Sequence, residues 1–301
     1  MFWVLLRFLR IAAPRRVRYQ TKPENARMTE QLEGLRPSAG WPVVHWFYRL
    51  DRPRWRSQTA ETREALVEEF QNFLERLNAE PELQVVPQAG VTKFDFGLMA
   101  IHPDLWRLQQ LGQQIASTGL GACLVPVYQF LSLTEASEYI TNELDWARLL
   151  IEEQKLDPTS PEFATRFAAL RKRTAIYAES RIHPKLPDDY PVVCFYPMSK
   201  ARRDQDNWYR LSFEERKKLM LQHGEAGRRF ADRVTQLITT CTGLDDWEWG
   251  VTLFARDLKA IRDIVYELRY DEASAVYGLF GSFYVGIRFA PKHLARVLHL
   301  S

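Results

Sequence analysis

The fold is decided by a short stretch that occurs twice, as FDFG at residues 94–97 and as WEWG at residues 247–250. The second copy follows the first at a distance of 153 residues, and each copy leads to an Asp-Leu pair, at 104–105 and at 257–258. Aromatic residues that alternate with other types are typical of a packed β-strand. The repetition predicts an internal duplication, in which these aromatic residues serve packing.

The residues around each copy extend the correspondence. Upstream, VVHWF at 43–47 matches VVCFY at 192–196 with an offset of 149. Between these strand-like runs, apolar residues recur at helical spacing in both halves. They are Val67, Phe70, Phe73, Leu74 and Leu77 in the first half, and Met220, His223, Gly227, Phe230, Val234, Leu237 and Cys241 in the second. The second set predicts a helix that continues to Cys241.

Each half is therefore predicted to contain a strand, a helix, two strands, a helix and a strand. The closing strands are expected at 124–133 and 280–289, which are rich in aromatic and β-branched residues. This is the order of a ferredoxin-like α+β unit. We predict a duplicated ferredoxin-like fold of the dimeric α+β barrel type, with the two sheets packed face to face.

Length and composition agree with two such units. The chain has 301 residues, of which 46% are apolar, and about 150 residues make a typical domain. We expect an irregular extension at 1–40, a first unit at 41–139, a helical connector and loop at 140–190, and a second unit at 191–301.

The positive charge is concentrated at the N-terminal end. Residues 1–27 carry seven basic side chains and one acidic side chain, a charge of +6 against +3 for the whole chain, which leaves −3 for the rest. A negative body does not attract phosphate backbones, so we expect no nucleic-acid partner. Three widely spaced cysteines lack metal-ligand spacing and are predicted to be core thiols in a reducing compartment. They are Cys123, Cys194 and Cys241.

The first residues do not match a membrane span. The apolar residues 2–6 are followed by Arg7 and Arg10, so no run approaches the roughly 20 apolar residues of a spanning helix. The arginines lie within and after the apolar stretch, unlike the charge-first order of a secretory signal. We expect a cytoplasmic protein without a transmembrane segment.

His223 is the candidate metal ligand. Ser212 and Glu215 have capping-box spacing, which marks the helix start and places His223 on the stripe that faces the sheet. Gly224 and Gly227 remove bulk beside it, so a large flat group can approach. A lone imidazole, without a second histidine at i+3 or i+4, suits an axial haem ligand better than a zinc site. The alternative is a hydrogen-bonded core histidine.

A second candidate group lies on the strand at 192–198. Alternation puts Cys194, Tyr196 and Met198 on one face, which Lys200 continues if the strand extends. A phenol beside a cation that can bind carboxylate indicates redox chemistry. The alternative is a packed aromatic residue followed by an exposed lysine. The first-half helix lacks histidine and cysteine, so we predict a porphyrin site in the second half only.

Several separated segments then carry a family resemblance. They are CFYPMSK at 194–200, NWY at 207–209, HG at 223–224 with GR at 227–228, TGLDDW at 242–247 and FGSFYVG at 280–286. Together and in this order they resemble the chlorite dismutase superfamily and, within it, the coproheme decarboxylases. The resemblance covers most of residues 41–290 and is dense from residue 190 onward.

The resemblance implies a role for each matching residue. His223 matches the proximal ligand of the porphyrin iron, and Tyr196 matches a tyrosine that becomes a radical beside the reacting propionate. Lys200 matches a residue that binds the propionate carboxylate. The other matches are the propionate and pocket contacts Arg181, Met198, Trp208, Ser274 and Tyr128, and the distal residue Gln236.

Two features depart from a simple match. His183 stands where many family members have a tyrosine, two positions after Arg181, and the loop to Tyr196 is one residue longer. On one straight helix, Gln236 would lie 13 residues, about 20 Å, beyond His223. Its distal position therefore follows from the resemblance alone.

The implied activity is a peroxide-dependent haem synthesis. Iron coproporphyrin III (coproheme) would be substrate and redox centre, hydrogen peroxide the oxidant, and haem b the product once two propionates have become vinyl groups. The family also implies a homopentamer, with a coproporphyrin ferrochelatase as a transient partner. Two alternatives stay open. One is a chlorite dismutase, an activity that goes with a distal arginine in place of Gln236, and the other is a non-catalytic haem carrier or sensor.

Overall fold

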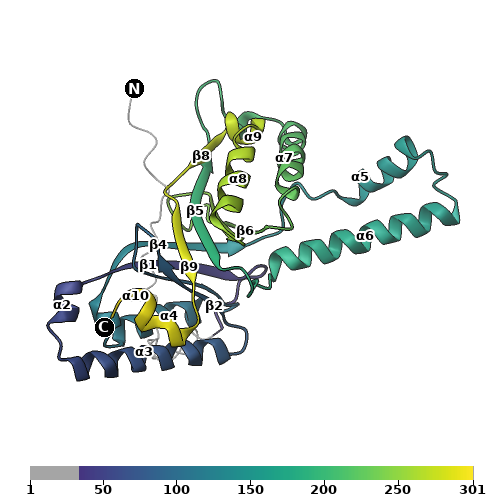
Figure 1. Cartoon of the computed structure of the whole chain (residues 1–301). Coiled ribbons are helices and arrows are strands. Elements are labelled where there is room, and N and C mark those ends of the chain that lie inside the picture. Colours follow the sequence, from purple (N-terminus) through teal and green to yellow (C-terminus); the bar gives the residue numbers. More distant parts are fainter. Residues whose placement is uncertain (1–33, 301) are drawn as a thin grey trace, which may run out of the picture.

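A computed structural model describes residues 34–300. Among these residues, nine strands form a single antiparallel sheet (Figure 1). The strands are β1 (Pro42–Leu50), β2 (Gln84–Gly90), β3 (Phe96–Ile101), β4 (Leu124–Thr134), β5 (Val192–Lys200), β6 (Val234–Thr240), β7 (Trp249–Ala255), β8 (Gly278–Phe280) and β9 (Tyr284–Arg288).

The helices lie outside the sheet. They are α2 (Arg52–Arg56), α3 (Ala60–Ala79), α4 (Leu105–Ser117), α5 (Glu143–Arg148), α6 (Pro161–Ile182), α7 (Phe213–Arg228), α8 (Leu258–Leu268), α9 (Glu272–Ala275) and α10 (Leu294–Leu298), with short helical turns η1 (Gly121–Cys123), η2 (Leu149–Glu153), η3 (Trp208–Arg210) and η4 (Pro291–His293). The predicted capping box of Ser212 and Glu215 starts α7. Thr59 caps the start of α3, where its side-chain oxygen accepts from the backbone N–H of Thr62.

The two halves have the same strand order, which confirms the predicted duplication. The order is β4-β1-β3-β2 in the first half and β9-β5-β7-β6 in the second. The halves also pair edge to edge, β2 with β9 and β4 with β6, so the sheet closes on itself, and β8 extends the end of β5. Face-to-face packing alone is therefore an incomplete description, because each half also supplies hydrogen-bond partners for the unpaired strand edges of the other.

The ladders correct the offset between β1 and β5 by one residue. Tyr48 pairs with Phe96, and Met198 pairs with Trp249. Because Phe96 and Trp249 are equivalent in the repeated stretch, β1 and β5 correspond at an offset of 150 rather than 149. A slip of one residue exchanges the two faces of a strand, so the predicted offset matched inner residues with outer ones.

The predicted continuation of the second-half helix to Cys241 is wrong. α7 ends at Arg228, and Val234 and Leu237 belong to β6. The apolar spacing there fits a helix, but the run is rich in β-branched residues, which favour a strand. Gln236 therefore lies on a strand beside the helix and not about 20 Å further along it.

Both halves contribute to the interior of the closed sheet, where aromatic side chains dominate. One interior cluster contains Phe47, Phe94, Phe130, Phe195 and Cys241. The outer face is covered by α3, α4 and α10 in the first half and by α7, α8 and α9 in the second (Figure 1). All three cysteines are buried free thiols, as predicted.

The connector forms an arm that projects from the body (Figure 1). α6 has no buried residue, whereas the adjoining α5 is tied to α7 by an ion pair of 2.5 Å between Asp145 and Lys217. Among residues 34–300, none of the helices has the length and apolarity needed to span a bilayer.

The predicted unit boundaries remain predictions. The sheet joins the first unit to the second, so hydrogen bonds cross between 41–139 and 191–301. Of the predicted extension at 1–40, residues 1–33 lie outside the described residues.

Candidate functional site

The candidate site lies on the outer face of the second half, between the strands and the helices α7, α8 and α9. Cys194 and Tyr196 of β5 point to this side, where they pack with Val251 and Leu253 of β7. Their neighbour Phe195 points into the closed sheet. The predicted alternation along β5 is therefore correct, and it extends to Lys200, the last residue of the strand.

His223 is held by a carboxylate. Its Nδ1 lies 3.1 Å from Oδ2 of Asp271 and 3.4 Å from Oγ of Ser274. Burial raises the pKa of the Asp271 carboxyl, but hydrogen bonds from His223 and Ser274 outweigh this and keep the pKa below its ordinary value. An ionised carboxylate only accepts, so Nδ1 donates and Nε2 of a neutral ring retains its lone pair.

The space beside His223 is bordered by the two glycines and by Gln236. A Cβ atom on Gly224 would meet only the guanidinium of Arg228, at 3.4 Å. A Cβ atom on Gly227 would lie 3.1 Å from Nε2 of Gln236. The strand position of Gln236 thus brings its amide next to the helix of His223, which the one-helix prediction could not do.

Arg181 lies against the same strand. From the end of α6 it donates to the backbone carbonyls of Gln236 at 3.2 Å and of Ile238 at 3.3 Å. The structure therefore brings Arg181 and Gln236 together. In this arrangement the guanidinium is bonded to β6.

Tyr196 is a buried phenol in an aromatic setting. It is 4% exposed, its ring is stacked on that of Phe283 with centroids 4.4 Å apart, and Phe280 lies 5.9 Å away. Burial and the nearby Cys194 raise the pKa of Tyr196 above its ordinary value. The side chain is therefore a neutral phenol that can lose a hydrogen atom.

Lys200 is a buried ammonium group. Its Nζ lies 4.3 Å from the ring centroid of the buried Trp208 and donates to the carbonyl of Ala273 at 2.7 Å. Burial lowers its pKa to about 8, although the negative charges of Asp271 and Glu248 act in the opposite direction. Near neutral pH this group is a cation that can bind a carboxylate.

Comparison with known proteins now assigns the chain to a family. Residues 63–289 match the family model described as chlorite dismutase. The chain belongs to the chlorite dismutase family. Its sequence is 37% identical to the coproheme decarboxylase of Staphylococcus carnosus (strain TM300) over 252 residues, which is 82% of this chain and 91% of that relative.

Solved structures share the fold of this chlorite dismutase family protein. A haem-binding protein from Thermus thermophilus is similar with a TM-score of 0.71 at 34% identity, and the match covers 87% of this chain and 96% of that one. A chlorite dismutase variant from Candidatus Nitrospira defluvii has a TM-score of 0.64 at 17% identity, with 90% and 98% covered. The duplicated α+β fold is thereby confirmed.

The surroundings of His223 fit a haem-type group. The buried residues of α7 are only Lys217, Leu219 and Gly227, so few of its apolar side chains are buried. Half-buried apolar residues border the outer-face cluster: Val192, Met198, Ala226, Ile238, Val265, Phe280, Phe283 and Val285. An imidazole with an available Nε2 and an apolar wall suit an iron porphyrin.

Tyr128 does not join the other site residues. Its ring lies in the interior cluster, stacked on Tyr284 with centroids 5.0 Å apart, on the same side of the sheet as Phe195. Tyr196 lies on the opposite side. The predicted propionate contact at Tyr128 is therefore corrected, because strand alternation turns this side chain inward.

The contacts of His183 and Asp271 could not be read from the sequence. His183 caps the end of α6, and its Nδ1 lies 2.6 Å from Glu179. Asp271, the partner of His223, had a local signal, because it stands three positions before Ser274 and caps α9. Its contact with a histidine 48 positions away depends on the fold.

Proposed function

We propose that this protein is a coproheme decarboxylase, which converts iron coproporphyrin III to haem b with hydrogen peroxide as the oxidant. The observation that carries the proposal is the placement of an imidazole, a phenol and an ammonium group on one side of the sheet, in His223, Tyr196 and Lys200. The relative from Staphylococcus carnosus, named a coproheme decarboxylase, supports it.

His223 is proposed to hold the substrate. Asp271 accepts from Nδ1, which orients the ring and leaves Nε2 for the iron. Gly224 carries no side chain beside the ring, and Gly227 lets the amide of Gln236 come close to α7. Once bound, the iron porphyrin supplies the oxidising equivalent that peroxide delivers.

Tyr196 is proposed to carry out the hydrogen abstraction. Its oxidised side chain takes a hydrogen atom from the β-carbon of a propionate, and the O–H bond of the phenol is restored. The propionate then loses carbon dioxide and a second electron, which leaves a vinyl group. For each propionate, one peroxide accepts the two electrons and, with two protons, becomes two water molecules.

Lys200 is proposed to hold the reacting carboxylate through a charge-assisted hydrogen bond. The ring of Trp208 lies against its ammonium group and limits where it can point. Met198 lies two residues earlier on the same face of β5, and Ser274 lies beside His223. Both are proposed to line the same region. Arg181 is proposed to reach a further propionate by exchanging its bonds to the carbonyls of β6.

Gln236 distinguishes this proposal from a chlorite dismutase. Its neutral amide lies beside Gly227, at the position where a distal arginine goes with chlorite chemistry. We therefore expect no rapid oxygen evolution from chlorite. Assembly as a homopentamer, transient contact with a coproporphyrin ferrochelatase and a cytoplasmic location complete the proposal, and light scattering of the purified protein tests the first of these.

One experiment tests the activity directly. The protein is loaded with iron coproporphyrin III, and the bound porphyrin is analysed by mass spectrometry before and after peroxide is added. The expected result is loss of two carboxyl groups in two steps, ending at haem b. A porphyrin that keeps all four propionates, although it binds normally, would contradict the proposal.

A further inference from the structure

Glu248 fastens the end of β5. This glutamate is only 5% exposed. Its backbone N–H donates to the carbonyl of Met198 at 3.1 Å, and its Oε2 accepts from the backbone N–H of Lys200 at 2.7 Å. Its Oε1 lies 3.4 Å from the guanidinium of Arg202. One residue thus contacts three positions around the end of the strand, two of them through its carboxylate.

The same arrangement occurs at the end of β1 in the first half. The backbone N–H of Asp95 donates to the carbonyl of Tyr48 at 2.8 Å, and its Oδ2 accepts from the backbone N–H of Leu50 at 2.9 Å. Its Oδ1 lies 3.2 Å from the guanidinium of Arg52. Each contact has its counterpart in the second half, so this carboxylate clamp belongs to the duplicated frame.

The two clamps differ in the residue that they hold. Leu50 is part of the apolar cluster under the first-half helices, whereas Lys200 presents an ammonium group to the candidate site. We propose that Glu248 is a positioning residue of the active site, which fixes the backbone of Lys200 and brings a buried negative charge within reach of its ammonium group. This inference rests on the proposed function, in which Lys200 binds a propionate.

The charges around Lys200 give the proposal a measurable sign. The ammonium group faces the ring of Trp208 and the carbonyl of Ala273, and the nearby charged groups are Asp271 and Glu248. Burial lowers the pKa of Lys200 to about 8, and both carboxylates raise it. Removal of one carboxylate charge therefore lowers this pKa further, and carboxylate binding is lost at a lower pH.

The test is the pH dependence of binding of iron-free coproporphyrin III, followed by fluorescence titration between about pH 6 and pH 9. This probe carries the four propionates and requires neither the iron ligand nor turnover. The variant Glu248→Gln keeps an oxygen that can accept from the N–H of Lys200 and removes the charge. The matched control is Asp95→Asn, which makes the same change in the clamp that holds leucine.

We expect the affinity of Glu248→Gln to fall at a lower pH than that of the unmodified protein. The Kd should rise about fivefold to tenfold near pH 7.5 and stay within about twofold near pH 6. Asp95→Asn should keep the profile of the unmodified protein. An unshifted profile in Glu248→Gln, or an equal shift in both variants, would overturn the inference.

Two further variants complete the test. The side chain of Arg202 is 68% exposed, so Arg202→Ala should fold even if Glu248→Gln does not. Without Arg202, the charge of Glu248 is uncompensated and raises the pKa of Lys200. The fall in affinity should therefore move to a higher pH. A shift to lower pH, or none, contradicts the inference. Lys200→Met tests the premise. If its pH profile of binding equals that of the unmodified protein, Lys200 does not bind the carboxylate and the proposed role of Lys200 is refuted. If its profile is flat and the profile of Glu248→Gln is unshifted, only the inference about Glu248 is refuted.

Discussion

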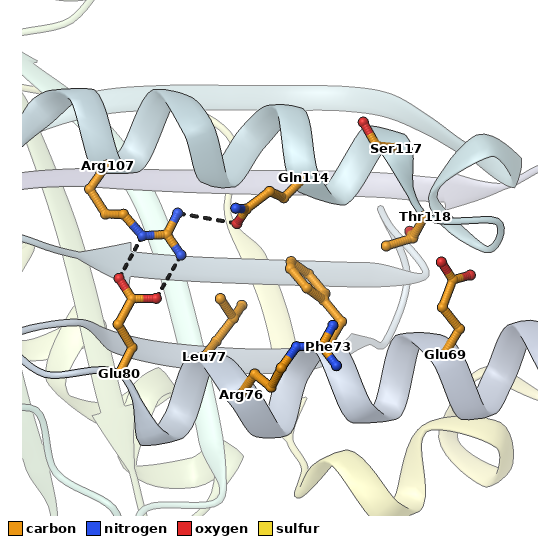
Figure 2. Close-up of a pocket in the computed structure, with 9 residues that line it drawn as sticks. All are labelled: Glu69, Phe73, Arg76, Leu77, Glu80, Arg107, Gln114, Ser117 and Thr118. Atoms are coloured by element: carbon orange, nitrogen blue, oxygen red, sulfur yellow. Dashed lines mark hydrogen bonds and ion pairs between the residues drawn. The ribbon is translucent and has the colours of Figure 1, made fainter. Parts of the chain in front are cut away.

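The helix layers of the two halves cover equivalent strands, but only one of them is filled by its own side chains. α3 buries Phe70, Phe73, Leu74 and Leu77, whereas α7 buries only one large apolar residue, Leu219. Figure 2 shows the groove between α3 and α4, which Phe73 and Leu77 line beside an ion pair of Arg107 with Glu80 at 2.5 Å. Apart from this groove, the first layer is packed with its own apolar side chains, whereas the second presents a half-buried apolar wall.

The difference can be followed residue by residue. Counted from the caps Thr59 and Ser212, Phe70 and His223 occupy the same helix position. The ladders similarly relate the remaining site residues of β5 and β6 to first-half positions. Tyr196 corresponds to Trp46, Met198 to Tyr48, Lys200 to Leu50 and Gln236 to Val85. All five first-half counterparts belong to one buried cluster, so the positions proposed to carry chemistry in the second half serve packing in the first.

The largest expected effect comes from His223, the counterpart of Phe70. His223→Ala removes the proposed iron ligand, so the ferric high-spin spectrum of the coproheme complex should be lost or greatly altered in absorption and electron paramagnetic resonance. His183→Ala, at the point where α6 joins the body, serves as the control and should leave the spectrum unchanged. An unaltered spectrum in His223→Ala would return this residue to the core-histidine alternative.

Replacement of the phenol should abolish turnover while preserving the pocket. Tyr196→Phe keeps the ring stacked on Phe283, so coproheme should bind within about twofold, but decarboxylation should slow by about a hundredfold or more. Peroxide titration followed by mass spectrometry measures this, with Tyr284→Phe on the inner face as the control. Turnover at the rate of the unmodified protein would exclude the radical role, and Trp208 would be tested next.

Stability measurements should separate the two helix layers in the porphyrin-free protein. Phe70 is fully buried, so Phe70→Ala should lower the free energy of unfolding by about 3–5 kcal/mol in urea titrations. Met220→Ala, on the half-buried face of α7, should lower it by only about 1 kcal/mol. Equal losses would show that both layers are equally packed and would remove the contrast.

The smallest expected effect concerns the interior that both halves share. His45 and its counterpart Phe195 stack on each other with centroids 4.1 Å apart, and burial lowers the pKa of His45 to about 3. The unfolded chain therefore binds a proton below about pH 6.5 that the folded chain excludes. Stability should fall with decreasing pH, by about 2 kcal/mol at pH 5.

The variant His45→Phe should remove this part of the acid sensitivity, as measured by urea unfolding at several pH values. His183→Gln, which changes a histidine at the junction of α6 with the body, is the control and should retain this acid sensitivity. An identical pH slope in His45→Phe and in the unmodified protein would show that His45 takes up its proton in the folded state.

The sequence predicts the duplicated architecture but not the residue-by-residue register between the two halves. The repeated FDFG and WEWG stretches predict the duplication, and the face shared by Tyr196, Met198 and Lys200 follows from alternation alone. The offset of β1 and β5 was one residue wrong, because similar runs align equally well on either face. Apolar spacing also extended α7 across a turn, since a short apolar run does not separate helix from strand.

The partners of the site residues were beyond sequence reasoning. Asp271 contacts His223, and Glu248 contacts Lys200, each across 48 positions of the chain. Tyr128 was assigned to the site although its side chain lies inside the closed sheet. Which face a residue occupies, and which distant carboxylate meets it, depends on strand register and helix docking, which local patterns do not fix.

Closure of the sheet by β9 has a consequence for biosynthesis. This strand pairs with β5 and also with β2, where Arg288 lies opposite Gln88 although 200 positions separate them. Contacts of such high sequence separation form slowly, because a long loop must close first. At a synthesis rate of about 5–20 residues per second, the edge of β2 stays unpaired for many seconds before β9 has been made. Until residue 288 has emerged, this unpaired strand edge is therefore available for pairing with another chain.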